Sequence, residues 1–510
     1  MTRAAFSSKA CKEITCSMNF KKQRPNPPFF FEKEQVISFL RLGRCLSHLL
    51  VVVLLTGLLA GCSGLFAQLP GKGDGDSPAS PPLASSSMSP SSGKSATASP
   101  DNATPSTNAS ASAEPPPSAS ASASASLSPS TSASVEATLD GMTMEEKVGQ
   151  MMFPAFRNTY TGAPLLFADE STRKAIKKWK PGGIILFSVN LDTVPQTAAL
   201  IRQLKGSSAI PLLIGVDEEG GRVSRLADAK KLGAVPMPQA AIIGKTGNPE
   251  LAREAAAAMG TQLSELGFNL DFAPVADINT NPDNPVIGDR AYGTKPAPTS
   301  LMVVEALRGL QDAGIIPVVK HFPGHGDTQT DSHLGLAIVP HDRKRMDAVE
   351  LVPFRAAIAA GAPVVMTGHI NTPGISDKNL PATLNPDILT DLLRTELHFD
   401  GVIITDAMEM GAITKNYDES ESTLLAVEAG ADMLLVPVSL ERACMALLDA
   451  VKSGRISERR MNDSVRRILT LKATYGLERM VPDDVLPLPQ RFSDTNAWQK
   501  IVARIDAAAR

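Results

Sequence analysis

The segment of the chain that is most informative about chemistry is short and spans residues 320–333. The segment reads Lys-His-Phe-Pro-Gly-His-Gly-Asp-Thr-Gln-Thr-Asp-Ser-His and supplies Lys320, His321, His325, Asp327, Asp331 and His333. Its glycines and proline indicate a loop. So many polar groups in one loop are costly unless a site uses them. Imidazole and carboxylate groups can transfer protons near neutral pH, so the segment is a candidate for catalysis.

A metal centre is the rival interpretation of this segment. Its ligands would be His321, His325, Asp327 and His333, because imidazole and carboxylate groups bind zinc. However, Phe-Pro-Gly separates His321 from His325, and that sequence prevents the helix that would bring the two rings onto one face. We therefore expect neither a metal nor a cofactor.

Ionisable residues also follow three other apolar runs. Asp217-Glu-Glu-Gly-Gly-Arg follows the run 212–216, His369 comes just after the run 364–367, and Asp406 follows the run 402–405. A single Asp after a strand is most often a turn residue or a helix cap. Four strands that each end in ionisable side chains indicate a site at the carboxyl edge of a parallel sheet.

The elements that would position these residues alternate along the chain. Short apolar runs predict strands at Val148–Phe153, Gly183–Phe187, Pro211–Val216, Asn269–Val275, Ile315–Lys320, Ala362–Thr367, Gly401–Thr405 and Ala431–Val436. Helical patterns lie between them, for example at Leu251–Gly267, Ala356–Gly361 and Leu424–Gly430, and a capping box at Thr143–Glu146 starts another helix. This α/β pattern predicts a (β/α)8 TIM-like barrel, with a doubly wound sheet as the alternative.

The N-terminal residues predict export and lipid attachment. A basic stretch precedes an apolar run at 49–59, which is too short for a comfortable membrane span. The following Leu-Ala-Gly-Cys62 resembles the lipobox of bacterial lipoproteins, which implies cleavage before Cys62 and acylation of its sulfur. Residues 1–61 are thus expected to be a signal peptide with a long n-region. The mature protein would be lipid-anchored to the cell membrane and would face the extracellular or periplasmic side.

Composition divides the rest of the chain. Residues 62–135 are rich in Ser, Ala and Pro and predict a disordered tether of roughly 50 Å as a coil. A barrel is expected over 136–478 and a C-terminal tail over 479–510. The net charge of −3 argues against a nucleic-acid partner, and a monomer is expected. Cys444 would be the one cysteine left after Cys62 is acylated, so no disulfide is expected.

The segment 320–333 is similar to the signature of bacterial β-N-acetylglucosaminidases of glycoside hydrolase family 3. The similarity covers about residues 140–478 and includes Leu139-Asp-Gly-Met-Thr-Met-Glu-Glu, Val216-Asp-Glu-Glu-Gly-Gly-Arg-Val, Asn269-Leu-Asp-Phe-Ala-Pro-Val-Ala-Asp, Asn284-Pro-Val-Ile-Gly-Asp-Arg, Thr405-Asp-Ala-Met-Glu-Met-Gly and Val465-Arg-Arg-Ile-Leu. Relatives often carry a second domain after the barrel, whereas this sequence ends at Arg510. The site is therefore expected to be complete within the barrel.

The resemblance implies a role for each matching residue. Asp406 would be the nucleophile and His333 the general acid/base, with Asp331 orienting the imidazole ring. The residues that would grip the sugar hydroxyls are Asp217, Arg290, Lys320 and His321. Alternatives remain open: Arg290 could pair with Asp289 or Asp277 in a structural network, His325 and His369 could be structural, and the runner-up carboxylates are Glu218, Glu219 and Glu409.

The resemblance implies a retaining exo-β-N-acetylglucosaminidase that acts on cell-wall fragments, as in peptidoglycan turnover, or on related amino-sugar glycans. Most retaining glycosidases use two carboxylates, whereas an Asp-His dyad would replace one of them here. Two enzymatic alternatives are a family 3 phosphorylase and a β-glucosidase. A sugar-binding lipoprotein without turnover is the non-enzymatic alternative.

Overall fold

The computed structural model describes residues 128–329, 335–477 and 487–510. The predicted signal peptide, Cys62, most of the predicted tether, and the Asp331–His333 dyad lie outside these residues. Among the described residues, no helix combines the length and the apolar composition needed to cross a bilayer.

Eight of the described strands form parallel pairs in chain order. A six-stranded sheet has the order β11-β9-β7-β6-β3-β2, and β1 pairs with β12. The bounds are β1 Met152–Phe153, β2 Gly183–Ile185, β3 Leu213–Val216, β6 Leu270–Asp271, β7 Ile316–Phe322, β9 Val364–Thr367, β11 Val402–Thr405 and β12 Leu434–Leu435. All eight lie within or overlap the predicted runs, so the predicted α/β class with a parallel sheet is confirmed.

Two isolated bridges join the strand pair to the sheet. Ala155 bridges to Ile185 and Ile404 bridges to Met433, both in parallel orientation. The strand order therefore runs from β1 to β12 and back to β1 without the reversal that defines a doubly wound sheet. This connectivity is consistent with the predicted (β/α)8 barrel.

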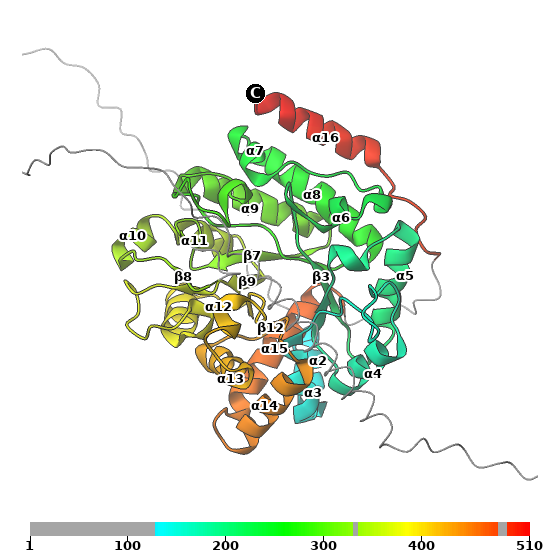
Figure 1. The fold of residues 1–510 in the computed structure, drawn as a ribbon, viewed down its shortest axis with the longest axis vertical. Coiled ribbons are helices and arrows are strands. Elements are labelled where there is room, and N and C mark those ends of the chain that lie inside the picture. Colours follow the sequence, from blue (N-terminus) through cyan, green and yellow to red (C-terminus); the bar gives the residue numbers. More distant parts are fainter. Residues whose placement is uncertain (1–127, 330–334, 478–486) are drawn as a thin grey trace, which may run out of the picture. The chain divides into compact units, whose positions relative to one another are not determined.

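Helices follow each strand and surround the sheet (Figure 1). Their bounds are α3 Met144–Gln150, α4 Glu170–Trp179, α5 Val194–Lys205, α6 Arg225–Asp228, α7 Ala240–Lys245, α8 Pro249–Leu266, α9 Pro296–Asp312, α10 Arg343–Ala348, α11 Val352–Ala359, the π-helix Asp387–Glu396, α12 Gly411–Thr414, α13 Glu419–Ala429, α14 Leu440–Lys452 and α15 Glu458–Thr474. The predicted capping box is confirmed, because Thr143 and Glu146 bond reciprocally at the start of α3.

Close packing against Phe153 explains why β2 has a glycine at position 183. Phe153 of β1 is fully buried, and its ring meets that of Phe272 edge to face at a centroid distance of 5.5 Å. A Cβ added to Gly183 in β2 would lie 2.3 Å from the Phe153 ring. Any larger residue at position 183 would therefore displace the aromatic side chain that fills this part of the core.

The structure corrects the end of the predicted tether. Helix α2 spans Pro129–Gly141, so residues 129–135 are helical rather than disordered. Ser128 caps the helix, and Val135 and Leu139 are buried. Glu136 pairs with Arg466 of α15 at 2.7 Å. Packing against a helix more than 300 residues away therefore overrides a Ser- and Ala-rich local composition.

The predicted C-terminal tail contains a docked helix, α16 Thr495–Ala508. Trp498 and Ile505 are buried, and the Trp498 ring meets Phe492 edge to face. Arg504 pairs with Glu254 of α8 at 2.5 Å. The end of the described chain is thus fixed against α8 by both apolar and ionic contacts.

Lys472 of α15 is buried beside the end of α3, and burial lowers its pKa to about 7. Its Nζ donates to Gln150 Oε1 at 2.6 Å. Because this pKa lies below that of the unfolded chain, the folded protein binds fewer protons and its stability should rise between about pH 7 and pH 10.

Lys472→Met should therefore stabilise the protein by about 1–4 kcal/mol at pH 6. In the wild type the buried amine costs free energy, either because its charge is desolvated or because it must lose its proton. The gain should shrink at pH 9.5. Chemical unfolding at the two pH values measures this difference. An equal gain at both would show that Lys472 does not titrate with folding.

Candidate active site

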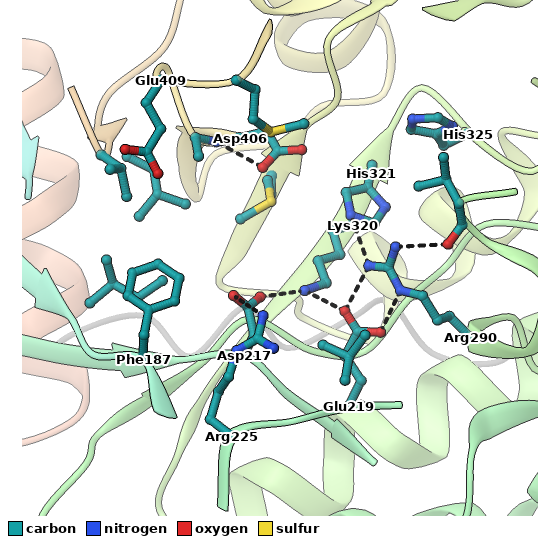
Figure 2. Close-up of a pocket in the computed structure, with 18 of the residues that line it drawn as sticks. Phe187, Asp217, Glu219, Arg225, Arg290, Lys320, His321, His325, Asp406 and Glu409 are labelled. Carbon is teal, nitrogen blue, oxygen red and sulfur yellow. Dashed lines mark hydrogen bonds and ion pairs between the residues drawn. The ribbon is translucent and has the colours of Figure 1, made fainter. Parts of the chain in front are cut away.

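A pocket opens where the carboxyl ends of the strands meet, and it gathers five predicted site residues: Asp217, Arg290, Lys320, His321 and Asp406 (Figure 2). Its volume is about 260 Å³, just below the range of about 300–1,000 Å³ for small-molecule sites. The other two predicted catalytic residues, Asp331 and His333, lie outside the described residues.

The five side chains reach the pocket from four separate segments of the chain. Asp217 directly follows β3, Lys320 and His321 are in β7, and Asp406 directly follows β11. Arg290 ends a short 3-10 helix, Gly288–Arg290, between β6 and α9. Parallel strands bring these distant residues to one edge of the sheet, as the sequence pattern predicted.

Two carboxylates and two cations form one buried charge cluster. Lys320 Nζ lies 2.8 Å from Asp217 Oδ1 and 2.7 Å from Glu219 Oε1. Arg290 donates two bonds of 2.8 Å to the two oxygens of Glu219. Burial raises the pKa of Glu219, but the charges of Arg290 and Lys320 outweigh burial and hold that pKa below its usual range. The cluster is thus a fixed array of charged hydrogen-bonding groups.

The structure identifies the partner of Arg290. It pairs with Glu219 rather than with Asp289 or Asp277, the two partners considered from the sequence. Asp289 instead pairs with Arg222 at 2.6 Å. The bidentate pairing fixes the guanidinium plane and leaves Arg290 at the wall of the pocket.

His321 is oriented by a buried carboxylate. Its Nδ1 lies 2.7 Å from Asp277 Oδ2, and Asp277 is fully buried. Asp277 also accepts the backbone N–H of His325 at 2.7 Å. The ring therefore directs Nε2 toward the pocket, where it lies 3.4 Å from Arg290 Nη2. Asp277 acts on the site through His321 as a positioning residue.

Asp406 presents its carboxylate at the pocket wall. Its Oδ1 accepts the N–H of Ala407 at 2.7 Å, which orients the carboxyl group immediately after β11. Figure 2 shows Asp406 between the side of the pocket that carries Arg290 and the side that carries Phe187. A carboxylate in this position can act as a nucleophile toward a ligand held by the charge cluster.

The runner-up carboxylates have other partners. Glu218 is buried, and burial raises its pKa to about 7. It accepts hydrogen bonds from the N–H of Leu226 at 3.0 Å and from the hydroxyl of Ser224. Glu219 holds the two cations, and Glu409 accepts two bonds from Arg157. These pairings give Glu218 a structural position and leave Glu219 and Glu409 as supporting groups in the pocket wall.

The two further histidines differ in position. His325 lines the pocket, and burial together with His321 lowers its pKa to about 4. Its Nδ1 lies 2.7 Å from Thr328 Oγ1. His369 is buried, with Nδ1 near Thr383 Oγ1 and Nε2 near the carbonyl of Ala407. His369 thereby supports the backbone next to Asp406.

Three predicted metal ligands, His321, His325 and Asp327, lie among the described residues, and they do not form a group with metal-ligand spacing. Asp327 contacts His341 and lies 3.8 Å from Arg345. Within the described ranges, the one group with metal-ligand spacing is Asp327, His341 and Glu350. Arg345 pairs with Glu350 at 3.0 Å in the same cluster, so a cation already balances those carboxylates.

Sequence reasoning gave Glu219 and Asp277 other roles and missed Arg157, Phe187 and Arg225. Glu219 lines the pocket and holds Arg290 and Lys320. Asp277 orients His321, and Arg157, Phe187 and Arg225 also line the pocket. Arg225 lies 3.6 Å from Asp217 and follows it by eight positions in the sequence, just beyond the matched segment Val216–Val223. No local pattern connects Arg157 with Glu409, because 251 residues separate them in the chain.

Comparison with known proteins agrees with this fold and identifies the family. Residues 143–471 match the glycosyl hydrolase family 3 N terminal domain. The chain therefore belongs to glycosyl hydrolase family 3.

Two similar proteins are named beta-hexosaminidases. Beta-hexosaminidase A of Pseudoalteromonas piscicida is 32% identical over 367 residues, 65% of this chain and 61% of the relative. Beta-hexosaminidase LpqI of Mycobacterium tuberculosis is 36% identical over 309 residues, 58% of this chain and 77% of the relative. The chain thus spans about three fifths of the length of the first of these relatives.

A solved structure is also similar. It is a glycoside hydrolase family 3 β-N-acetylglucosaminidase from Paenibacillus sp. str. FPU-7, with 43% sequence identity and a TM-score of 0.68. The similarity covers 72% of this chain and 69% of that chain.

Proposed function

We propose that this chain is a retaining exo-β-N-acetylglucosaminidase that removes terminal N-acetylglucosamine. The observation that carries the proposal is the position of Asp406 in one pocket with Asp217, Arg290, Lys320 and His321. The charge cluster would hold the hydroxyls of one sugar ring, and Asp406 would attack its anomeric carbon. The similarity to the β-N-acetylglucosaminidase from Paenibacillus supports this choice of glycone.

The reaction would proceed in two displacements. As the Asp406 oxygen bonds to the anomeric carbon, the bond to the leaving oxygen breaks and that oxygen takes a proton from His333. Water then attacks the glycosyl-enzyme, His333 takes its proton, and Asp406 departs as a carboxylate. Asp331 would orient the ring of His333; these two roles rest on the resemblance of the segment 320–333.

We also infer that the eight strands form a (β/α)8 barrel. The uninterrupted parallel order from β1 to β12 and the two bridges support it. The position of the pocket also supports it, since active sites of such barrels lie at the carboxyl ends of the strands.

One assay separates the proposed activity from its enzymatic alternatives. Release of nitrophenol from the aryl β-N-acetylglucosaminide and from the aryl β-glucoside should be measured with and without phosphate. We expect hydrolysis of the first substrate without a need for phosphate. Phosphate-dependent formation of a sugar 1-phosphate would instead support the phosphorylase alternative. This chain is 25% identical to a solved structure titled beta-glucoside phosphorylase BglX. A relative from Cellulomonas fimi is named for both glycosidase activities, so the glucoside is a necessary comparison.

We propose that the enzyme is anchored through an acylated Cys62 and acts outside the cytoplasm on cell-wall fragments or related glycans. The support is the basic stretch, the apolar run 49–59 and the Leu-Ala-Gly-Cys62 sequence. A tether of about 65 residues after Cys62 would let the catalytic unit work away from the membrane surface.

Cys62→Ser should release or mislocalise the enzyme while activity in the soluble fraction persists, because one acylated cysteine would supply the anchor. Detergent partition of full-length protein measures the change. Cys45→Ser is the matched control, since Cys45 would leave with the signal peptide. Unchanged partition of Cys62→Ser would contradict the anchor.

A further inference from the structure

A short hairpin, residues 157–165, follows β1, and its first residue, Arg157, lines the pocket. Asn158 bridges to Pro164 in antiparallel orientation. Thr159 N–H donates to the carbonyl of Ala163 at 2.8 Å, and Gly162 N–H donates to that of Thr159 at 2.9 Å. The second bond closes a turn that places Tyr160 at the tip, where its side chain is 87% exposed.

The base of the hairpin is fixed to the wall of the pocket by one buried side chain. Asn190 Nδ2 donates to three carbonyls, those of Phe156, Arg157 and Leu165, at 3.0–3.2 Å. Asn190 Oδ1 accepts the N–H of Phe187 at 3.0 Å. The hairpin and Phe187 are therefore held in one arrangement before any ligand binds.

The side chain of Arg157 turns from the hairpin into the pocket. Its guanidinium lies 4.1 Å from the centre of the Phe187 ring and pairs with both oxygens of Glu409. Figure 2 places Phe187 and Glu409 on one side of Asp406 and places Arg290 on the other. The hairpin thus begins on the side of the nucleophile that lies away from the sugar-gripping cluster.

We propose that this hairpin forms the subsite for a saccharide leaving group, with Tyr160 as a specificity-determining residue. The inference rests on the proposed function, in which the charge cluster holds the terminal ring and Asp406 faces its anomeric carbon. The leaving group then extends to the side of Arg157. Tyr160 follows Arg157 by three positions, so their Cα atoms are at most about 11 Å apart, within reach of the next rings of a glycan.

The chemistry of the tip suits a neutral sugar. An exposed aromatic face can stack on the apolar face of a sugar ring, and the hydroxyls of Thr159 and Thr161 lie beside it, 2.8 Å from one another. The charge of Arg157 is balanced by Glu409. This part of the rim therefore offers stacking and neutral hydrogen bonds rather than a net charge for an ionic leaving group.

The test compares substrates that share one glycone and differ in leaving group. β-N-acetylglucosaminyl fluoride has a leaving group too small to reach the hairpin, whereas the β-linked trisaccharide of N-acetylglucosamine extends past it. Tyr160→Ala should lower kcat/KM on the trisaccharide by about three- to tenfold and change it by less than about twofold on the fluoride. Tyr160→Phe keeps the aromatic face and should restore most of the loss. Leu301→Ala removes another exposed apolar side chain, on α9, and is the matched control.

A Tyr160→Ala enzyme whose trisaccharide-to-fluoride ratio equals that of the wild type would overturn the subsite while leaving the proposed activity intact. A wild-type enzyme that hydrolyses neither substrate would overturn the proposed function and the subsite with it. A loss that Tyr160→Phe does not restore would exclude stacking as the contact.

Discussion

Asp406→Ala should lower kcat by at least about a thousandfold, which corresponds to a loss of about 4 kcal/mol of transition-state stabilisation. The reason is that no other described carboxylate is placed to replace it. Glu219 is held by two cations, and Glu409 is held by Arg157. The melting temperature should change little, since Asp406 is a pocket-wall residue rather than a member of the buried charge cluster.

The identity of the nucleophile can be read directly. A fluorinated sugar that forms a slow-turnover glycosyl-enzyme should label the wild-type protein at Asp406, and peptide mass spectrometry locates the label. A label on Glu409, or no label on an enzyme that is inhibited, would exclude Asp406 as the nucleophile. Small anions such as azide should partly restore turnover of Asp406→Ala on activated aryl glycosides, because they can enter the space left by the carboxylate.

Glu219→Gln should affect both stability and substrate binding. The amide keeps the shape of the side chain but removes the charge that faces Arg290 and Lys320, and breaking a buried ion pair costs about 3–5 kcal/mol. Lys320 retains Asp217, whereas Arg290 loses its bidentate partner. We therefore expect a lower melting temperature together with a higher KM, because the cations that would hold the sugar hydroxyls lose their fixed positions.

The pH dependence of folding stability provides a second test of Glu219. Because the folded pKa of Glu219 is lowered, its contribution is present above the unfolded pKa of about 4.3 and is lost as pH falls toward the folded value. Glu219→Gln should lack this part of the acid sensitivity. Glu441→Gln is the control, since its pair with Lys178 is exposed and should be worth less than about 1 kcal/mol. Equal losses of unfolding free energy in the two variants would show that the buried cluster stabilises the protein no more than an exposed ion pair does.

The sequence predicted the sheet well because buried parallel strands leave a simple signal. Each of the eight apolar runs contains or overlaps a strand, although several strands are shorter than their runs. In the run Asn269–Val275, β6 covers only Leu270–Asp271. Pro274 has no N–H for the ladder, which is one reason why regular pairing does not extend through this run.

The positions of Asp217, Lys320 and Asp406 could also be predicted, since each stands at the end of an apolar strand. Their partners could not, because pairing across the sheet has no period in the sequence. Asp277 and His321 are 44 residues apart, and Glu219 and Arg290 are 71 apart. The helix at Pro129–Gly141 escaped prediction for a related reason: its stability comes from packing on α15 rather than from its own composition.

The order of the strands has a consequence for biosynthesis. The pocket takes Asp217 from the end of β3, Lys320 from β7 and Asp406 from β11, and β12 joins the sheet edge to β1. The pairing of β1 with β12 links Met152 to Leu434, so a nascent chain cannot form that contact until nearly all of the family domain has left the ribosome. Such long-range pairing is slow relative to local helix formation. Enzymatic activity should therefore be among the last properties that the growing chain acquires, and truncations before β12 should be inactive even where several βα units have already folded.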